Sequence, residues 1–174
     1  SIEKLRVMAN HRSISFQVEA PGDLRALANR EALNQVLLNL ILNSIEAMEA
    51  IDPRSRRITI ETRLAAERHE VAPDIHEHQV QTTVRDTGPG LKEIDVDRLF
   101  TPFYTTKPRG TGIGLSISRF IIETHEGRLW AEPGVGGGAA FSFTVPVATG
   151  PADADAETGL AGVLGSARDI GAKR

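Results

Sequence analysis

The chain alternates between apolar and polar residues along several short stretches, which is the pattern of strands that bury one face. In the first stretch, polar residues separate Ile14, Phe16 and Val18. The next two stretches flank the polar, patternless residues 65–78, which predicts an antiparallel pair joined by a long loop. The last two form a hairpin around the loop at 133–138. The predicted strands cover residues 13–19, 57–64, 79–86, 128–132 and 139–147.

The longest helical pattern covers residues 30–50, where apolar residues recur at steps of three and four. Asn29 can cap its start. Asn39 and Asn43 lie one turn apart on a face beside the apolar stripe. Polar helix faces are usually solvated, but the apolar residues flanking these two side chains favour a half-buried position that points at a ligand. The predicted stripe consists of Val36, Leu37, Leu40, Ile41, Ser44, Ala47 and Met48.

Two further helical segments are predicted, with a loop between them. A short helix covers residues 93–100, and residues 101–110, rich in Pro, Thr and Gly, indicate a mobile lid. We expect Phe100 and Phe103 to hold this lid against the core. The second helix covers residues 112–126 and ends before Gly127. Its expected buried residues are Ile113, Leu115, Ile117, Phe120 and Ile121.

These elements together predict an α+β fold. It is a two-layer α/β sandwich, with a mixed, mostly antiparallel sheet of about five strands and three helices on one face. Residues 1–12 read as the end of an upstream segment, and residues 13–147 as the folded domain. Residues 148–174 are rich in Ala, Gly, Asp and Ser and keep no apolar face, so we expect a flexible tail or linker.

Charge and composition narrow the possible partners. The net charge is −3, with 20 basic and 23 acidic residues mixed along the chain, so neither nucleic acid nor an anionic membrane is an expected partner. The absence of cysteine excludes disulfides and weakly favours the cytoplasm. No apolar run is long enough to span a bilayer, so we expect no direct membrane contact from this segment, and any membrane anchor would lie outside it.

Two glycine-rich motifs carry the candidate chemistry. The sequence Asp-Thr-Gly-Pro-Gly at 86–90 ends a predicted strand, and Gly-Thr-Gly-Ile-Gly-Leu at 110–115 opens a predicted helix. Alternate glycines leave backbone amides free to approach phosphate oxygens, and a helix N-terminus carries partial positive charge. The sequence therefore predicts an anion site there. It contains no P-loop, and its one loose dinucleotide fingerprint, at 134–139, leads into a strand instead of a helix.

Four blocks, taken in order, resemble the ATP-binding domain of sensor histidine kinases, within the GHKL superfamily of ATPases and kinases. They are NLILNSIEAM at 39–48 (the N box), DTGPG at 86–90 (the G1 box), LFTPFYTTK at 99–107 (the F box and lid) and GTGIGL at 110–115 (the G2 box). The residues of these blocks are most similar to those of the nitrogen-regulation and oxygen-sensing branch of these kinases. The resemblance spans residues 12–146.

The resemblance implies an ATP and Mg²⁺ site. It implies that Asp86 accepts a hydrogen bond from the adenine amino group, that Asn43 binds Mg²⁺ through its amide oxygen, and that Lys107 neutralises the γ-phosphate unless it is an ordinary solvated lysine. We expect Asn43, Asp86 and Gly112 to border one cavity. The implied nucleotide-binding residues are Asn39, Asn43, Glu46, Ala47, Asp86, Gly88, Gly90, Leu91, Lys107, Gly110, Thr111, Gly112, Ile113, Gly114 and Leu115; Asn39 and Lys107 are the catalytic candidates.

Asn39 bears on which reaction is expected. Where hydrolysing relatives typically carry a Glu that serves as a general base, an amide cannot take a proton from water. The resemblance therefore implies a protein-histidine kinase that passes the γ-phosphoryl group to a histidine on a separate, upstream dimerisation domain, and from there to a response regulator receiver domain. Two alternatives stay open: a GHKL ATPase of the repair or chaperone type, and a nucleotide-sensing module without catalysis.

Overall fold

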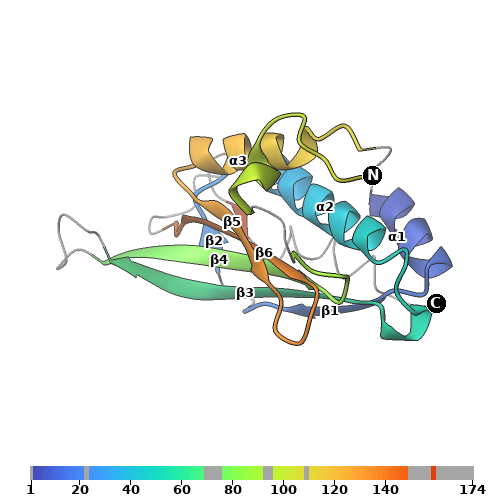
Figure 1. The fold of residues 1–174 in the computed structure, drawn as a ribbon. Coiled ribbons are helices and arrows are strands. Elements are labelled where there is room, and N and C mark those ends of the chain that lie inside the picture. The colour runs from blue at the N-terminus through green and yellow to red at the C-terminus, as the bar shows by residue number, and fades with distance from the viewer. Residues whose placement is uncertain are drawn as a thin grey trace.

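A five-stranded sheet covered on one face by helices forms the body of the protein (Figure 1). The computed structural model describes residues 2–21, 24–68, 76–91, 96–107, 110–148 and 158–159. Its α-helices are α1 (Ile2–His11), α2 (Arg30–Ala47) and α3 (Gly114–Thr124), and its 3-10 helices are η1 (Pro53–Ser55) and η2 (Val96–Phe100). Its strands are β1 (Ser15–Glu19), β2 (Arg25–Ala26), β3 (Arg57–Arg68), β4 (His76–Asp86), β5 (Leu129–Pro133), β6 (Ala139–Pro146) and β7 (Thr158–Gly159).

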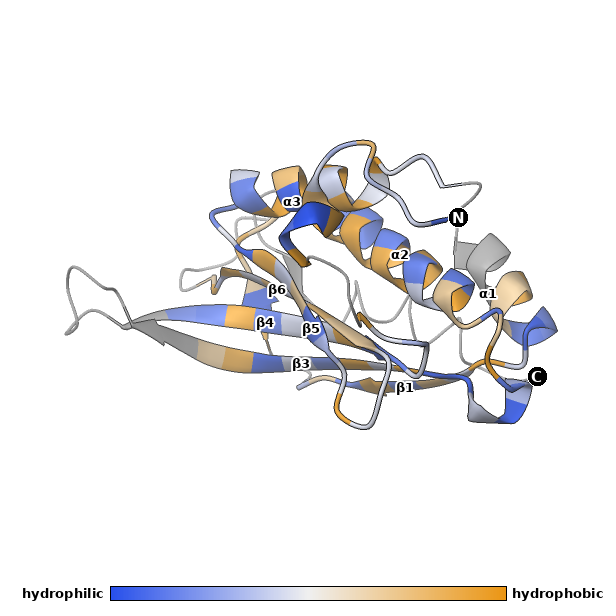
Figure 2. Ribbon diagram, viewed as in Figure 1, coloured by the Kyte–Doolittle hydropathy of each residue, from blue (hydrophilic) through white to orange (hydrophobic). Residues whose placement is uncertain are grey.

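The sheet is mixed, with the strand order β1-β3-β4-β6-β5. β1 runs parallel to β3, and every other neighbouring pair in this sheet is antiparallel. Ile60 stands opposite Val84 across the β3–β4 pair, and Val84 stands opposite Phe141 across β4–β6. Figure 2 shows hydrophilic and hydrophobic residues following one another along β3 and β4. The predicted fold class and the antiparallel pair are confirmed. The long loop expected at 65–78 is partly wrong, because β3 continues to Arg68 and β4 begins at His76; residues 69–75 lie outside the described part.

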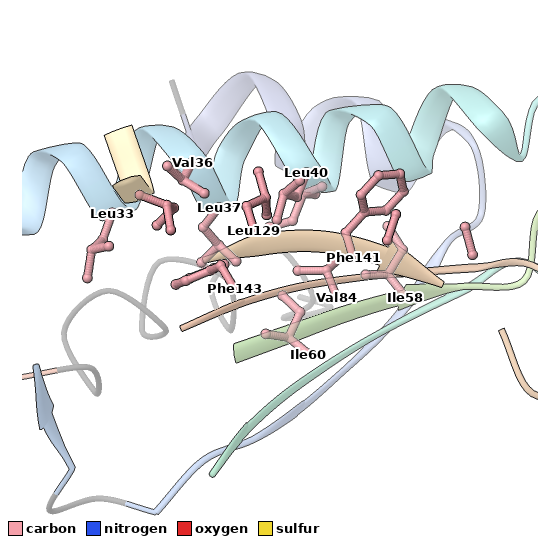
Figure 3. Close-up of a cluster of buried hydrophobic side chains, with 14 of the residues drawn as sticks. Leu33, Val36, Leu37, Leu40, Ile58, Ile60, Val84, Leu129, Phe141 and Phe143 are labelled. Atoms are coloured by element: carbon pink, nitrogen blue, oxygen red, sulfur yellow. The ribbon is translucent and has the colours of Figure 1, made fainter. Parts of the chain in front are cut away.

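The core lies between the sheet and α2. Leu33, Val36, Leu37 and Leu40 point from α2 toward the strands, where they meet residues that include Phe143 (Figure 3). All five are at most 2% exposed. Full burial of one such side chain stabilises the fold by about 1.5–3 kcal/mol. The apolar stripe predicted for this helix therefore faces the core, as expected.

Asn29 begins α2 as predicted. Its side-chain oxygen accepts a hydrogen bond from the amide of Ala32 at 3.0 Å, so one otherwise unpaired donor of the first turn is satisfied. The helix ends at Ala47, and residues 48–50 form a turn where we had expected the last residues of the helix. The short helix expected at 93–100 is the 3-10 helix η2, and residues 92–95 lie outside the described part.

The face that α3 buries agrees with the prediction only in part. Leu115 and Ile121 are partly buried and pack against the core as expected, whereas Phe120 is 65% and Ile117 is 42% exposed. The fully buried residues of α3 are Ser118 and Ile122. Apolar residues occur on more than one side of this helix, so their spacing did not fix its rotation. The buried side of α3 also carries a polar contact with α2, because the Nδ2 of Asn39 donates a hydrogen bond to Ser118 Oγ at 2.9 Å.

The chain ends contribute two small elements. The segment expected to end an upstream region forms α1, where Ala9 is fully buried and packs with the core. Within the predicted tail, β7 pairs antiparallel with β2, and apart from Ala148 the rest of 148–174 lies outside the described residues. The described helices include none that is both long and apolar enough to cross a membrane.

Candidate functional site

A cavity of about 260 Å³ opens between α2, the lid and the start of α3. It is the place where the N-box helix and the second glycine motif meet. The predicted site residues that line it are Asn39, Asn43, Glu46, Lys107, Gly110, Thr111, Gly112, Gly114 and Leu115. The remaining lining residues, which the sequence analysis did not assign to the site, are Leu42, Leu99, Tyr104, Thr105 and Thr106.

One face of α2 supplies the polar groups of the cavity. Asn39, Asn43 and Glu46 follow one another at steps of four and three residues, so their side chains project in nearly the same direction. All three are half-buried. The expectation that the two asparagines point at an open site instead of bulk solvent is met, and Glu46 extends the same row by almost one turn.

Lys107 reaches from the lid to this row of oxygens. Its Nζ donates hydrogen bonds to Asn43 Oδ1 at 3.0 Å and to Glu46 Oε2 at 2.6 Å. The side chains of the Lys107–Glu46 ion pair are 35% and 36% exposed, so solvent screens the pair, and its contribution to stability is at most about 1 kcal/mol. Lys107 is therefore a partly buried member of the cavity wall and not a freely solvated loop residue.

The lid is held against the second glycine motif by its backbone. The amide of Phe103 donates to the carbonyl of Gly112 at 2.9 Å. Gly112 has φ +67, and a Cβ there would lie 2.5 Å from the carbonyl carbon of Phe103, so only glycine fits. The Phe103 side chain itself is 75% exposed, which contradicts the expectation that it packs on the core; Phe100, 4% exposed, meets that expectation.

The start of α3 faces the cavity with open backbone amides. Ile113 occupies its N-cap position without a side-chain hydrogen bond, and Gly112, Gly114 and Leu115 line the cavity. A Cβ on Gly114 would lie in contact with the Asn39 carboxamide, so a glycine here leaves room for that side chain. First-turn amides that are not capped by a side chain are suited to bind an anion.

Asp86 belongs to a second, buried cluster outside this cavity. It is 6% exposed; its Oδ1 accepts from the amides of Gly88 (2.9 Å) and Ala139 (3.1 Å), and its Oδ2 accepts from Ser44 Oγ (3.1 Å). Gly88 lies against Ala47, since a Cβ on it would be 3.5 Å from that of Ala47. The other predicted binding residues that do not line the cavity are Gly90, Leu91 and Ile113.

The two clusters are joined through α2. Asn43 points into the cavity, and the next residue, Ser44, binds the Asp86 carboxylate. The cavity thus holds Asn43 and Gly112 as expected, whereas Asp86 stands beside it instead of in its wall. Ser44 is the residue that the sequence analysis assigned only to the apolar stripe. A hydroxyl within an otherwise apolar stripe was the signal that could have identified it.

The sheet-and-helix fold, an asparagine row on α2 and glycine-rich turns on two sides define an ATP-binding domain of the histidine kinase type. The family described as histidine kinase-, DNA gyrase B- and HSP90-like ATPases matches residues 28–149, and the chain belongs to this family.

Two curated relatives show which members of this family the chain is similar to. The chain is 40% identical over 135 residues to the sensor protein FixL of Bradyrhizobium diazoefficiens, covering 78% of this chain and 24% of FixL. It is 34% identical over 144 residues to the sensor histidine kinase TmoS of Ectopseudomonas mendocina, covering 82% of this chain and 14% of TmoS. The chain therefore spans a quarter or less of the length of these two curated relatives.

Among solved structures, the nucleotide-free catalytic domain of the histidine kinase ThkA matches with a TM-score of 0.63 at 34% identity, covering 83% of this chain and 89% of that domain. Full-length ShkA in complex with AMPPNP matches with a TM-score of 0.63 at 26% identity, covering 87% of this chain and 29% of ShkA. The chain is thus similar to the ThkA catalytic domain over most of that domain's length.

Proposed function

We propose that this chain binds Mg·ATP in the cavity beside α2 and presents the γ-phosphoryl group to a histidine on another domain. The observation that carries the proposal is the arrangement of the cavity itself. Oxygen ligands from Asn43 and Glu46 face the uncapped N-terminus of α3 across one space, with Lys107 between them on the lid. Cation ligands and phosphate donors are therefore provided in the same cavity.

The donor set fits Mg²⁺. Asn43 Oδ1 and Glu46 Oε2 are hard oxygen atoms that already accept from one cationic nitrogen. Mg²⁺ in nucleotide sites commonly takes one or two protein oxygens and completes its shell with phosphates and water. Bound there, Mg²⁺ would supply charge neutralisation to the phosphates.

Asp86 is proposed as the adenine-recognising residue. Its carboxylate accepts three hydrogen bonds and has about four lone-pair sites, so one further donor can be accommodated. Adenine offers an amino group at the edge where guanine offers a carbonyl. A buried acceptor that is fixed by two backbone amides would therefore favour adenine.

Asn39 supports transfer in preference to hydrolysis. Its amide nitrogen donates to Ser118, and an amide cannot act as a general base for water. Phosphoryl transfer to a positioned nucleophile depends chiefly on alignment and charge neutralisation, which the remaining groups provide. We propose that the nucleophile is a histidine of a dimerisation domain, and that a response regulator receiver domain then takes the phosphoryl group.

Calorimetric titration with AMPPNP in the presence and absence of Mg²⁺ tests the binding step. Asn43→Ala should weaken binding about tenfold with Mg²⁺ and leave it nearly unchanged in EDTA, since one ligand of a shared ion is lost. Gln35→Ala, on the same side of α2 but exposed and outside the cavity, is the matched control. Equal affinities of Asn43→Ala and wild type in Mg²⁺ would remove Asn43 from the metal site.

The transfer step is tested with ATP and an added helical domain that carries the histidine. The proposed kinase should label that domain and hydrolyse ATP slowly by itself. Rapid steady hydrolysis would support an ATPase of the repair or chaperone type. Binding without any transfer would support a nucleotide-sensing module.

A further inference from the structure

The lid lysine and the proposed metal ion need the same two oxygen atoms. Lys107 Nζ lies 3.0 Å from Asn43 Oδ1 and 2.6 Å from Glu46 Oε2. Both oxygens come from adjacent turns of α2, and both converge on this one positively charged nitrogen. The position between them therefore suits a cation, and in this structure that cation is the ammonium group of Lys107.

Two cations cannot share this position. An ammonium group and a divalent ion at contact distance repel each other, and in a half-buried cavity the repulsion is screened less than in open solvent. Asn43 and Glu46 line the cavity and are themselves only half exposed to solvent. Entry of a divalent ion between these oxygens thus requires the Lys107 side chain to leave.

We propose that Glu46 is a second oxygen ligand of the divalent-cation site, and that Lys107 occupies this site as a competing cation until Mg·ATP displaces it. The inference rests on the proposed function, because it concerns the same metal position. The displaced ammonium group is then free to turn toward the phosphates. The contacts of the lid would therefore depend on whether a metal-bound nucleotide is present.

A second ion pair, just after the end of α2, provides a comparison for the Lys107–Glu46 pair. Arg12 Nη2 lies 2.7 Å from Glu49 Oε1, so its distance matches that of the Lys107–Glu46 pair. The Glu49 side chain is 60% exposed, and Glu49 does not line the cavity. Glu49→Gln therefore removes the same charge from the same end of α2 without touching the proposed cation position, and serves as the matched control.

Titration of the chain with Mn²⁺ alone, followed by the electron paramagnetic resonance signal of the free ion, tests the competition. Lys107→Met should tighten Mn²⁺ binding about fivefold or more, because a competing positive charge is removed. Glu46→Gln should weaken it by a similar factor, because a charged ligand becomes neutral. Glu49→Gln should match wild type, and circular dichroism melts should show that every variant is folded.

Hydrogen exchange supplies an independent readout from the lid. Mn²⁺ should speed amide exchange in residues 103–107 of the wild-type chain, whereas Lys107→Met should exchange fast with or without the ion. Unchanged or weaker Mn²⁺ affinity in Lys107→Met would overturn the competition, and unchanged affinity in Glu46→Gln would overturn the ligand role of Glu46.

A parallel AMPPNP titration separates this inference from the proposed function. If wild type binds the nucleotide with Mg²⁺ but the Mn²⁺ affinities of wild type and Lys107→Met agree, the competition is wrong and the proposed function stands. If wild type binds no nucleotide, both are wrong.

Discussion

The cavity beside α2 and the Asp86 cluster are built on the same helix, and they differ in what holds their polar groups in place. In the cavity, half-buried side chains from α2 are held by a lysine from the lid. In the cluster, a carboxylate that is 6% exposed is held by two backbone amides and a buried hydroxyl. A side chain on a loop can exchange its partner, whereas a strand end fixed by amides cannot. We infer that the proposed adenine site at Asp86 is formed before the nucleotide arrives and that the proposed metal and phosphate site is rearranged by it.

The Asp86 cluster should be disturbed most strongly by a substitution in the loop before β6. Gly138 has φ +76, and a Cβ there would lie in contact with the carbonyl oxygen of Asp86. Gly138→Ala should lower the free energy of unfolding by about 3 kcal/mol, combining left-handed backbone strain with displacement of a strand end. Thermal or urea unfolding measures the loss.

Gly136→Ala is the matched control for this change. Gly136 lies in the same loop with φ +83, but a Cβ there would meet nothing within 4 Å. It should carry only the backbone strain of about 1–2 kcal/mol. Equal losses for the two variants would show that the close approach to Asp86 is not what requires a glycine at 138.

Asp86→Asn tests what the fixed carboxylate recognises. The amide oxygen can still accept from Gly88 and Ala139, but the amide nitrogen would oppose the donor amino group of adenine. ATP affinity should fall about 30-fold or more, since a hydrogen bond to a charged acceptor is lost and two donors face each other. Calorimetry with ATP and with GTP measures the effect; an unchanged preference for ATP over GTP would remove Asp86 from base recognition.

The parts that sequence patterns predicted are those set by one continuous face or one short motif. The stripe of α2, its cap at Asn29 and the glycine-rich turns follow from local spacing, and the structure confirms the cap and the five strands of the main sheet. The helix ends at Ala47 instead of residue 50, and β3 and β4 extend into the stretch predicted as a loop. The pairing of β1 with β3 in parallel does not follow from alternation, because alternation identifies the buried face of a strand and not its neighbour.

Three features of the site could not be predicted from local sequence patterns, because they depend on contacts between residues that are distant in the sequence. The buried side of α3 includes the Asn39–Ser118 hydrogen bond, which joins residues far apart in the chain. Phe103 turns outward because its backbone has φ +66 and is tied to Gly112. The pairing of Lys107 with Asn43 and Glu46 joins a loop to a helix across the cavity, and motif spacing alone does not predict it.

Ser44→Ala gives the smallest expected effect and separates the two regions most directly. The variant leaves Asp86 Oδ2 without its hydroxyl donor while both backbone amides on Oδ1 remain, so the free energy of unfolding should fall by about 1 kcal/mol. ATP affinity should fall about threefold at most, because the carboxylate keeps its position. The ratio of affinities with and without Mg²⁺ should equal that of wild type, since Asn43 and Glu46 are untouched. A change in that ratio would mean that the base site and the metal site are coupled through α2, and that the cluster around Asp86 is less rigid than its backbone hydrogen bonds imply.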